Sequence, residues 1–200
     1  ADKFAMAVRR GKADDFLIKA EKAPNARGIR EMGLVSGADD GLDELVRAAE
    51  AGELKGLYLC GGDLLDVLAP ERLEALLGRM EVLIVHALRA DPRLARATVI
   101  FPTTTFAEKD GSFTNHAGRV QRIFKAIETP PGWLGDAEVF TRIWSALDGE
   151  ERRFNPQAVW ESIARTHPRF AGLSLEAMAA AGAMLDGSAA RGAAHSTADH

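Results

Sequence analysis

The sequence has little cysteine, and this shortage narrows what the protein can be. Cys60 is the only cysteine among 200 residues, so the chain cannot form an internal disulfide. One thiol also excludes an iron–sulfur cluster held by this chain alone, because such clusters need about four thiolate ligands. A sequence with so few thiols is typical of a reducing compartment.

Long apolar runs and an excess of charge are also missing. The apolar runs are far shorter than the roughly 20 residues that span a bilayer, which predicts no direct membrane insertion. The N-terminal stretch KFAMAVRRGK is too interrupted by charge to be the apolar part of a secretory signal. A net charge of −4 does not favour binding to a polyanion, so we expect no nucleic-acid partner.

The residues that are present predict four segments. Residues 1–40 are rich in loop-forming residues and form an irregular lead-in, with a short strand at 16–18. Residues 41–121 form a Rossmann-like α/β domain that includes a long loop at 102–121. Residues 122–187 form a helical extension, and residues 188–200 are small and polar enough to be disordered.

Alternating helical and extended patterns predict the α/β domain. A helical stripe begins at Leu42 and ends at Gly52, and a second helix begins at Pro70. Short apolar runs at 57–60, 82–85 and 98–101 predict buried strands. The alternation therefore predicts a parallel sheet of about three or four strands, with right-handed crossovers and helices on both faces.

Three stripes predict the helical extension. The first begins at Val139 or Phe140 and runs to Leu147. The second is capped by Asn155, and the third begins at Ser174 and runs to Gly187.

The end of the first strand carries residues that favour ligand contact. Gly61, Gly62 and Asp63 would expose backbone amides to a phosphate at a helix start, and they are candidate cofactor-binding residues. A tight strand-to-helix turn explains the same residues, because the spacing of a dinucleotide fingerprint is missing. Cys60 is expected to be a small buried hydrophobic residue, since no basic neighbour lowers its pKa.

Patterns of catalytic or metal-binding residues are scarce. The five histidines form no HxxxH, HxH or His–Cys pattern, so we expect no metal site. No Gly-x-Ser-x-Gly elbow exists to anchor a serine triad, and we expect no catalytic residue. His86 is expected at a strand exit, and His116, inside the long loop, is either a proton carrier or a solvated side chain.

The 102–121 segment is the most informative part of the chain. Pro102 closes an apolar strand, and a polar stretch follows at the sheet edge where α/β folds usually bind ligands. A structural role is the alternative: polar side chains bond to one another and to the backbone, with Gly111 and Gly118 at positive φ. The candidate cofactor-binding residues in this segment are Thr103, Thr104, Glu108, Gly111, Asn115 and Arg119.

The same segment resembles the molybdopterin oxidoreductase superfamily. The resemblance is carried by Pro102 and by the motif E-x-D-G-S-F-T-N-x-x-G-R-V-Q at 108–121. Further matches are P-N-x-x-G at 24–28 with Gly33, and P-P-G at 130–132 with Trp144. The resemblance covers about residues 14–185.

Within the superfamily, the sequence is most similar to a C-terminal region of the large, catalytic-like subunit of bacterial NADH-quinone oxidoreductase (complex I). Gly118-Arg119 stands where related formate dehydrogenases tend to carry two arginines. Two residues depart from the family pattern. Ser112 replaces the usual threonine and keeps a hydroxyl, whereas Ala117 replaces the usual glutamate and removes a charge.

The resemblance implies a scaffold region of a peripheral-arm subunit, which serves NADH-to-quinone electron transport without a redox centre of its own. No cofactor is then expected on this region, and iron–sulfur clusters are expected elsewhere in the full protein. Its partners would be other subunits or domains of the respiratory complex, on the cytoplasmic side of the inner membrane. Docking would use apolar faces such as those bearing Trp144 or Trp160. The match, together with Ala1 as first residue, predicts an excised region of a longer chain; the alternative is a processed or separately encoded protein.

Two other interpretations stay open. The chain is part of a molybdenum-dependent formate dehydrogenase-like oxidoreductase, or it is a free-standing binding module. In the first case the resemblance implies that the loop at 61–63 faces the molybdopterin guanine dinucleotide and that 103–121 approaches the pterin cleft.

Overall fold

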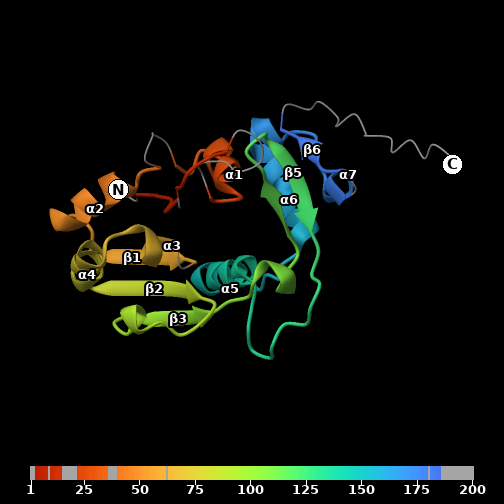
Figure 1. The fold of residues 1–200 in the computed structure, drawn as a ribbon. Coiled ribbons are helices and arrows are strands. Elements are labelled where there is room, and N and C mark those ends of the chain that lie inside the picture. The colour runs from red at the N-terminus through yellow and green to blue at the C-terminus, as the bar shows by residue number, and fades with distance from the viewer. Residues whose placement is uncertain are drawn as a thin grey trace, which may run out of the picture.

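The structure, a computed structural model, describes residues 3–8, 10–14, 22–35, 40–61, 63–179 and 181–185. Two three-stranded sheets organise this part of the chain, one parallel and one antiparallel (Figure 1). The predicted α/β class, with a parallel sheet and C-terminal helices, is confirmed.

The parallel sheet follows the predicted strands closely. Its strands lie in the order β1 (Gly56–Cys60), β2 (Val82–Ala87) and β3 (Val99–Pro102). The associated helices are α2 (Leu42–Glu50), α3 (Asp63–Val67), α4 (Pro70–Gly78) and the 3-10 turn η1 (Pro92–Leu94). Leucine and valine side chains from all of these elements except β3 form one buried core, because the apolar stripes of the helices face one side of the sheet.

The prediction that both faces of this sheet are covered is only partly right, because much of one face stays exposed. Tyr58, Ile84 and Val99 form one row across the face opposite the core, in register. Tyr58 is 38% and Val99 39% exposed, and Val82 in the next row is 44% exposed. The reason is that α4 and η1, which make the two crossovers, both pack into the core on the same face.

The predicted loop at 102–121 is largely a β-hairpin. After the 3-10 turn η2 (Phe106–Glu108), strand β4 (Gly111–Thr114) pairs antiparallel with β5 (Arg119–Ile123). The turn between them contains Asn115 and Gly118, with Gly118 at φ +85°. Apolar and polar residues alternate in the two strands of the hairpin, as suits strands with one exposed face. The many polar residues of this segment therefore predicted a loop where a hairpin forms.

The third predicted helix is shorter than expected. Helix α7 (Leu175–Ala179) begins after Ser174, whose hydroxyl accepts from the Ala177 amide, but it does not continue to Gly187. Instead, β6 (Ala183–Met184) pairs with β5. The tail at 188–200 lies outside the described residues.

The remaining helices complete the fold. The lead-in at 1–40 is not wholly irregular, because α1 (Ala26–Glu31) forms there; the strand expected at 16–18 lies outside the described residues. Helix α5 (Asp136–Asp148) lies beside the carboxyl ends of the parallel strands (Figure 1). Helix α6 (Pro156–Thr166), capped by Asn155 as predicted, and the turn η3 (Pro168–Phe170) build a second core with β5 and α7.

Among the described residues, no helix combines the length and the apolar character needed to cross a membrane.

Candidate functional site

The carboxyl ends of the parallel strands carry a network of polar side chains, which we call the Asp136 network. His86, at the end of β2, is fully buried. Its Nδ1 lies 2.9 Å from Asp136 Oδ1, and its Nε2 lies 2.8 Å from the Tyr58 hydroxyl. Asp136 also accepts from Thr103 Oγ1 at 2.7 Å and from Lys109 Nζ. The network therefore joins β1, β2, the end of β3, the segment before β4, and α5.

Aromatic rings enclose the imidazole of this network. The Phe140 ring of α5 stacks on His86 at 5.1 Å between centroids and on Tyr58 at 5.6 Å. Phe101 of β3 meets His86 edge-on at 5.5 Å. This packing explains why His86 reaches no solvent while Tyr58 remains partly exposed.

The charge of Asp136 determines which atoms donate and which accept in its hydrogen bonds. Burial alone would raise the pKa of Asp136, but hydrogen bonds from Lys109, Thr103 and His86 outweigh burial and lower it. An ionised carboxylate only accepts, so His86 Nδ1 must donate to it. In the tautomer of neutral imidazole that carries its proton on Nδ1, the Nε2 accepts from the hydroxyl of Tyr58. The pKa of Tyr58 is raised, chiefly by burial and further by Cys60 and Asp136.

Cys60 differs from its predicted environment. It was expected to be buried, but it is exposed at the carboxyl end of β1. Surrounding protein still removes enough water to raise the pKa of its thiol to about 11, and the nearby Asp136 acts in the same direction. At neutral pH the residue is therefore a thiol rather than a nucleophilic thiolate, as the sequence predicted.

The structure brings three of the nine candidate residues to this sheet edge. Gly61 follows β1 at φ +86°, and Thr103 and Thr104 follow β3 with both side chains buried. Asp63 begins α3, and Gly62 lies outside the described residues.

The other four candidates belong to the η2 turn and the hairpin. Glu108 closes a capping box on η2, where its carboxylate accepts from the Thr105 amide at 2.8 Å and hydroxyl at 3.0 Å. Gly111 is the first residue of β4 and, contrary to expectation, does not have positive φ. Arg119 donates to the Ala181 carbonyl at 2.8 Å.

Asn115 organises the turn of the hairpin. Its Oδ1 accepts from the amides of Ala117 at 3.0 Å and Arg119 at 2.9 Å. An asparagine that binds backbone amides two and four residues ahead fixes a turn locally. The role of Asn115 in this structure is therefore to shape the hairpin.

The two sequence motifs at 24–28 and 108–121 meet in space. Asn25 Oδ1 accepts from the Thr114 amide at 2.9 Å, and Arg27 donates to the His116 carbonyl at 2.8 Å. A Cβ on Gly28 would lie 2.8 Å from Thr114 Oγ1, so only glycine allows α1 to approach β4 this closely. The motifs thus dock α1 onto the hairpin.

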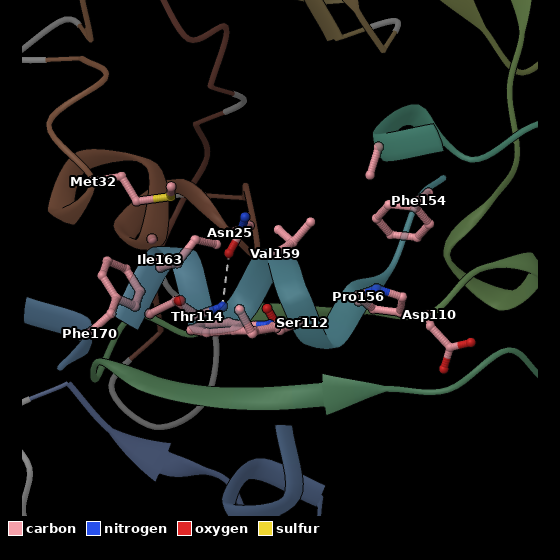
Figure 2. Close-up of a pocket in the computed structure, with 14 residues that line it drawn as sticks. Asn25, Met32, Asp110, Ser112, Thr114, Phe154, Pro156, Val159, Ile163 and Phe170 are labelled. Carbon is pink, nitrogen blue, oxygen red and sulfur yellow. Dashed lines mark hydrogen bonds between the residues drawn. The ribbon is translucent and has the colours of Figure 1, made fainter. Parts of the chain in front are cut away.

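Beside this contact lies a small cavity (Figure 2) of about 180 Å³. In Figure 2 its labelled lining residues come from both ends of α1, from β4 and from α6, and most of its surface is apolar. It is smaller than the roughly 300–1,000 Å³ typical of ligand sites. Its lining includes Met32, Ser112, Phe154, Val159, Ile163 and Phe170.

The sequence missed the central residues of the Asp136 network. His86 and Asp136 lie 50 residues apart, and Lys109 lies 27 residues from Asp136, so no local spacing indicates them. The available signal was His86 itself, because a histidine at the end of a buried strand needs polar partners.

The sequence resemblance implies a pterin dinucleotide at this sheet edge. The Gly61 amide donates to the His86 carbonyl at 3.3 Å, and the Thr103 hydroxyl and Lys109 ammonium both bind Asp136. Among the described residues, these candidate groups for a diphosphate are therefore engaged within the protein. Thr104 Oγ1, buried without a hydrogen-bond partner among the described residues, is one polar atom that a ligand would satisfy. With their other polar groups engaged, the described residues of this sheet edge do not fit a phosphate-rich dinucleotide.

The described residues also contain no group of three or more His, Cys, Asp or Glu side chains placed to hold a metal ion.

Comparison with known proteins identifies the family. The family model described as "Molybdopterin oxidoreductase" matches residues 11–143. The alpha subunit of an NADPH-Fe(3+) oxidoreductase from Geobacter sulfurreducens is 33% identical over 139 residues, which cover 69% of this chain and 16% of the relative.

Two further relatives are provisionally named formate dehydrogenases. The Bacillus subtilis protein is 31% identical over 156 residues, covering 74% of this chain and 15% of the relative. A Staphylococcus aureus protein is 30% identical over 174 residues, covering 82% of this chain and 16% of the relative. The chain thus spans about one sixth of the length of these curated relatives. With a family model that matches well over half of its residues, the chain belongs to the molybdopterin oxidoreductase family.

Proposed function

We propose that this chain is a scaffold region of a larger oxidoreductase and holds no redox centre of its own. The observation that supports the proposal is that the motif side chains bind other groups of the protein. Asn25 and Asn115 bind backbone amides, Glu108 caps η2, and Arg119 binds a carbonyl. Side chains engaged in this way order the hairpin and dock α1. In this role they need no ligand.

Within that class, we assign the chain to a peripheral-arm subunit of NADH-quinone oxidoreductase (complex I). The Gly118-Arg119 pair supports this assignment, because related formate dehydrogenases tend to carry two arginines at these positions. In this assignment the chain contacts other subunits or domains of the complex on the cytoplasmic side of the membrane. Electrons pass through centres elsewhere in the assembly.

A second candidate is a molybdenum-dependent, formate dehydrogenase-like oxidoreductase. It is favoured by the names of the Bacillus and Staphylococcus relatives and by the unpartnered, buried hydroxyl of Thr104. In this candidate Thr104 would contact a bound pterin cofactor, which supplies a molybdenum ion for two-electron chemistry.

Metal analysis of the native oxidoreductase that contains this chain separates the two candidates. The scaffold proposal predicts iron without stoichiometric molybdenum. One molybdenum per chain, reduced in a Thr104→Val variant but retained in a Thr141→Val variant, would overturn the proposal and favour the second candidate. Thr141 is a suitable control because it lies on α5, where its hydroxyl donates to the Ala137 carbonyl of its own helix.

A further inference from the structure

The open face of the parallel sheet continues onto α5. Neighbouring parallel strands place Gly56 beside Val82, and Tyr58 beside Ile84 and Val99, in two rows that stay partly exposed. The stacking of Tyr58 on Phe140 joins these rows to α5. Helix α5 then adds Trp144 and Leu147, which are 59% and 83% exposed. We call this surface the sheet–α5 face: Tyr58, Val82, Ile84, Val99, Phe140, Trp144 and Leu147.

A surface of this kind is unusual for a parallel sheet exposed to water. Parallel sheets occur almost only with both faces covered, because their strands are apolar on both sides. Apolar patches that join several elements mark interaction sites, and aromatic residues near the centre of such sites supply much of the binding energy. Tyr58, Phe140 and Trp144 would be those residues here.

We propose that the sheet–α5 face receives an amphipathic α-helix from the remainder of a larger oxidoreductase chain. This inference rests on the proposed function in placing the chain within a longer oxidoreductase. The matched relatives are about six times as long as the region they share with it, so in each of them further segments are tethered to this domain.

The dimensions of the face favour a helix. Three strands spaced about 4.8 Å apart present a strip about 10 Å wide between the outer strands. A helix with its side chains is about 10–12 Å in diameter and packs against a sheet along such a strip. One wall of the site is α5, where Arg152 lies 4.2 Å above the Trp144 ring and keeps it in place.

The two tryptophans that the sequence suggested for docking lie in different environments. Trp144 is exposed as a docking surface requires, but Trp160 is 7% exposed and belongs to the second core. The expectation that Trp160 docks a partner is therefore wrong, because the Phe170 ring packs against it at 6.0 Å between centroids.

Hydroxyl-radical footprinting tests the proposal on two preparations, the isolated 200-residue chain and the native oxidoreductase from its source cells. We expect oxidation of Tyr58 and Trp144 to fall severalfold in the native protein. Phe106 and Phe124, which are 65% and 52% exposed outside the sheet–α5 face, are controls and should change little. Equal oxidation of Tyr58 and Trp144 in both preparations would overturn the proposal.

A photo-cross-linker identifies the occupant. With p-benzoylphenylalanine in place of Val99, we expect cross-links to a peptide that forms a helix in the same longer chain. With the probe in place of Ile127, we expect no cross-link to that peptide. Cross-links to a second copy of this region, or to a different subunit, would overturn the proposal. Molybdenum measured in the same preparation and in its Thr104→Val variant keeps the two proposals distinguishable. Molybdenum that depends on Thr104 contradicts the scaffold role without affecting protection of Trp144.

Discussion

Asp136 is the residue on which the carboxyl edge of the sheet depends, because it accepts from side chains of three other segments. Asp136→Asn removes the charge opposite Lys109 while nearly keeping the shape of the side chain. We expect the free energy of unfolding at pH 7 to fall by about 2 kcal/mol, as is usual for hydrogen bonds to a charged group. Urea denaturation measures this loss.

Glu138→Gln is the matched control on the same helix. Glu138 pairs with Arg142 four residues away on the exposed surface of α5. Loss of such a pair costs about 0.2–0.5 kcal/mol. Equal losses in the two variants would show that the Asp136 network contributes no more than a surface ion pair.

The same carboxylate makes stability depend on acid pH. The pKa of Asp136 is lower in the folded protein than in the unfolded chain, so ionisation favours the fold. Its contribution to stability is complete above the pKa of about 4 that the carboxyl has in the unfolded chain. That contribution is lost as the pH falls through the lower pKa of the folded protein. We therefore expect the stability gap between the native chain and Asp136→Asn to shrink below pH 4 in denaturation series. A constant gap would contradict this account.

Tyr58 offers a direct spectroscopic view of the network, because it is the only tyrosine in the chain. Burial is the main cause of its raised pKa, with Cys60 and Asp136 adding to it. We expect the ultraviolet absorbance change of phenolate formation to have its midpoint above the ordinary value of about 10. Asp136→Asn should move the midpoint down, whereas Glu138→Gln should not. A midpoint at or below the ordinary value would contradict the burial of the hydroxyl beside His86.

Among the elements, the β4–β5 hairpin shows most clearly what sequence could and could not predict. The turn residues Asn115 and Gly118 were visible, but the polar character of the segment predicted a loop. The hairpin also pairs through β5 with β6, which follows about 60 residues later and lies inside a stretch whose apolar residues fit one helical stripe. The α2, β1, α4 and β2 elements were predictable because their apolar periodicity is local and strong.

The hairpin turn supplies a prediction about packing. At Gly118, φ is +85° and a Cβ would lie 2.9 Å from Arg27 Cζ, so Gly118→Ala meets backbone strain and also displaces the Arg27 guanidinium from its hydrogen bond to the His116 carbonyl. At Gly149, φ is +76° and no described atom lies within 4 Å, so Gly149→Ala meets strain alone. We expect strain of about 1–3 kcal/mol in each case and a larger loss for Gly118→Ala. Thermal unfolding compares them, and equal losses would show that Arg27 does not pack against the turn.

In the molecule as a whole, the family was predictable but the arrangement of the candidate site was not. The motifs at 24–28 and 108–121 were recognised separately, and nothing in their spacing indicates that Asn25 binds the Thr114 amide. Thr103 was predicted to face a ligand, and nothing in the sequence indicates that its hydroxyl binds Asp136. Such contacts arise from the tertiary fold, which brings distant segments together after local patterns have set the elements.

The exposed sheet–α5 face also belongs to the whole molecule. A continuously apolar strand predicts cover on both sides of the sheet, but strand composition alone does not indicate which segment supplies that cover. Within the described residues, α2, α3 and α4 supply one layer of helices, and α5 packs mainly on the row that contains His86. A larger chain would supply the rest of the second layer.

The central claim is that the motif at 108–121 orders the protein rather than binding a ligand, and Asn115→Ala tests it most directly. In the isolated, ligand-free chain we expect the free energy of unfolding to fall by about 1–2 kcal/mol, as for loss of a side chain that caps backbone amides. His116→Ala, exposed in the same turn, is the control and should change little. If Asn115→Ala leaves the stability unchanged, the turn does not need this side chain, and the structural account of the motif is contradicted.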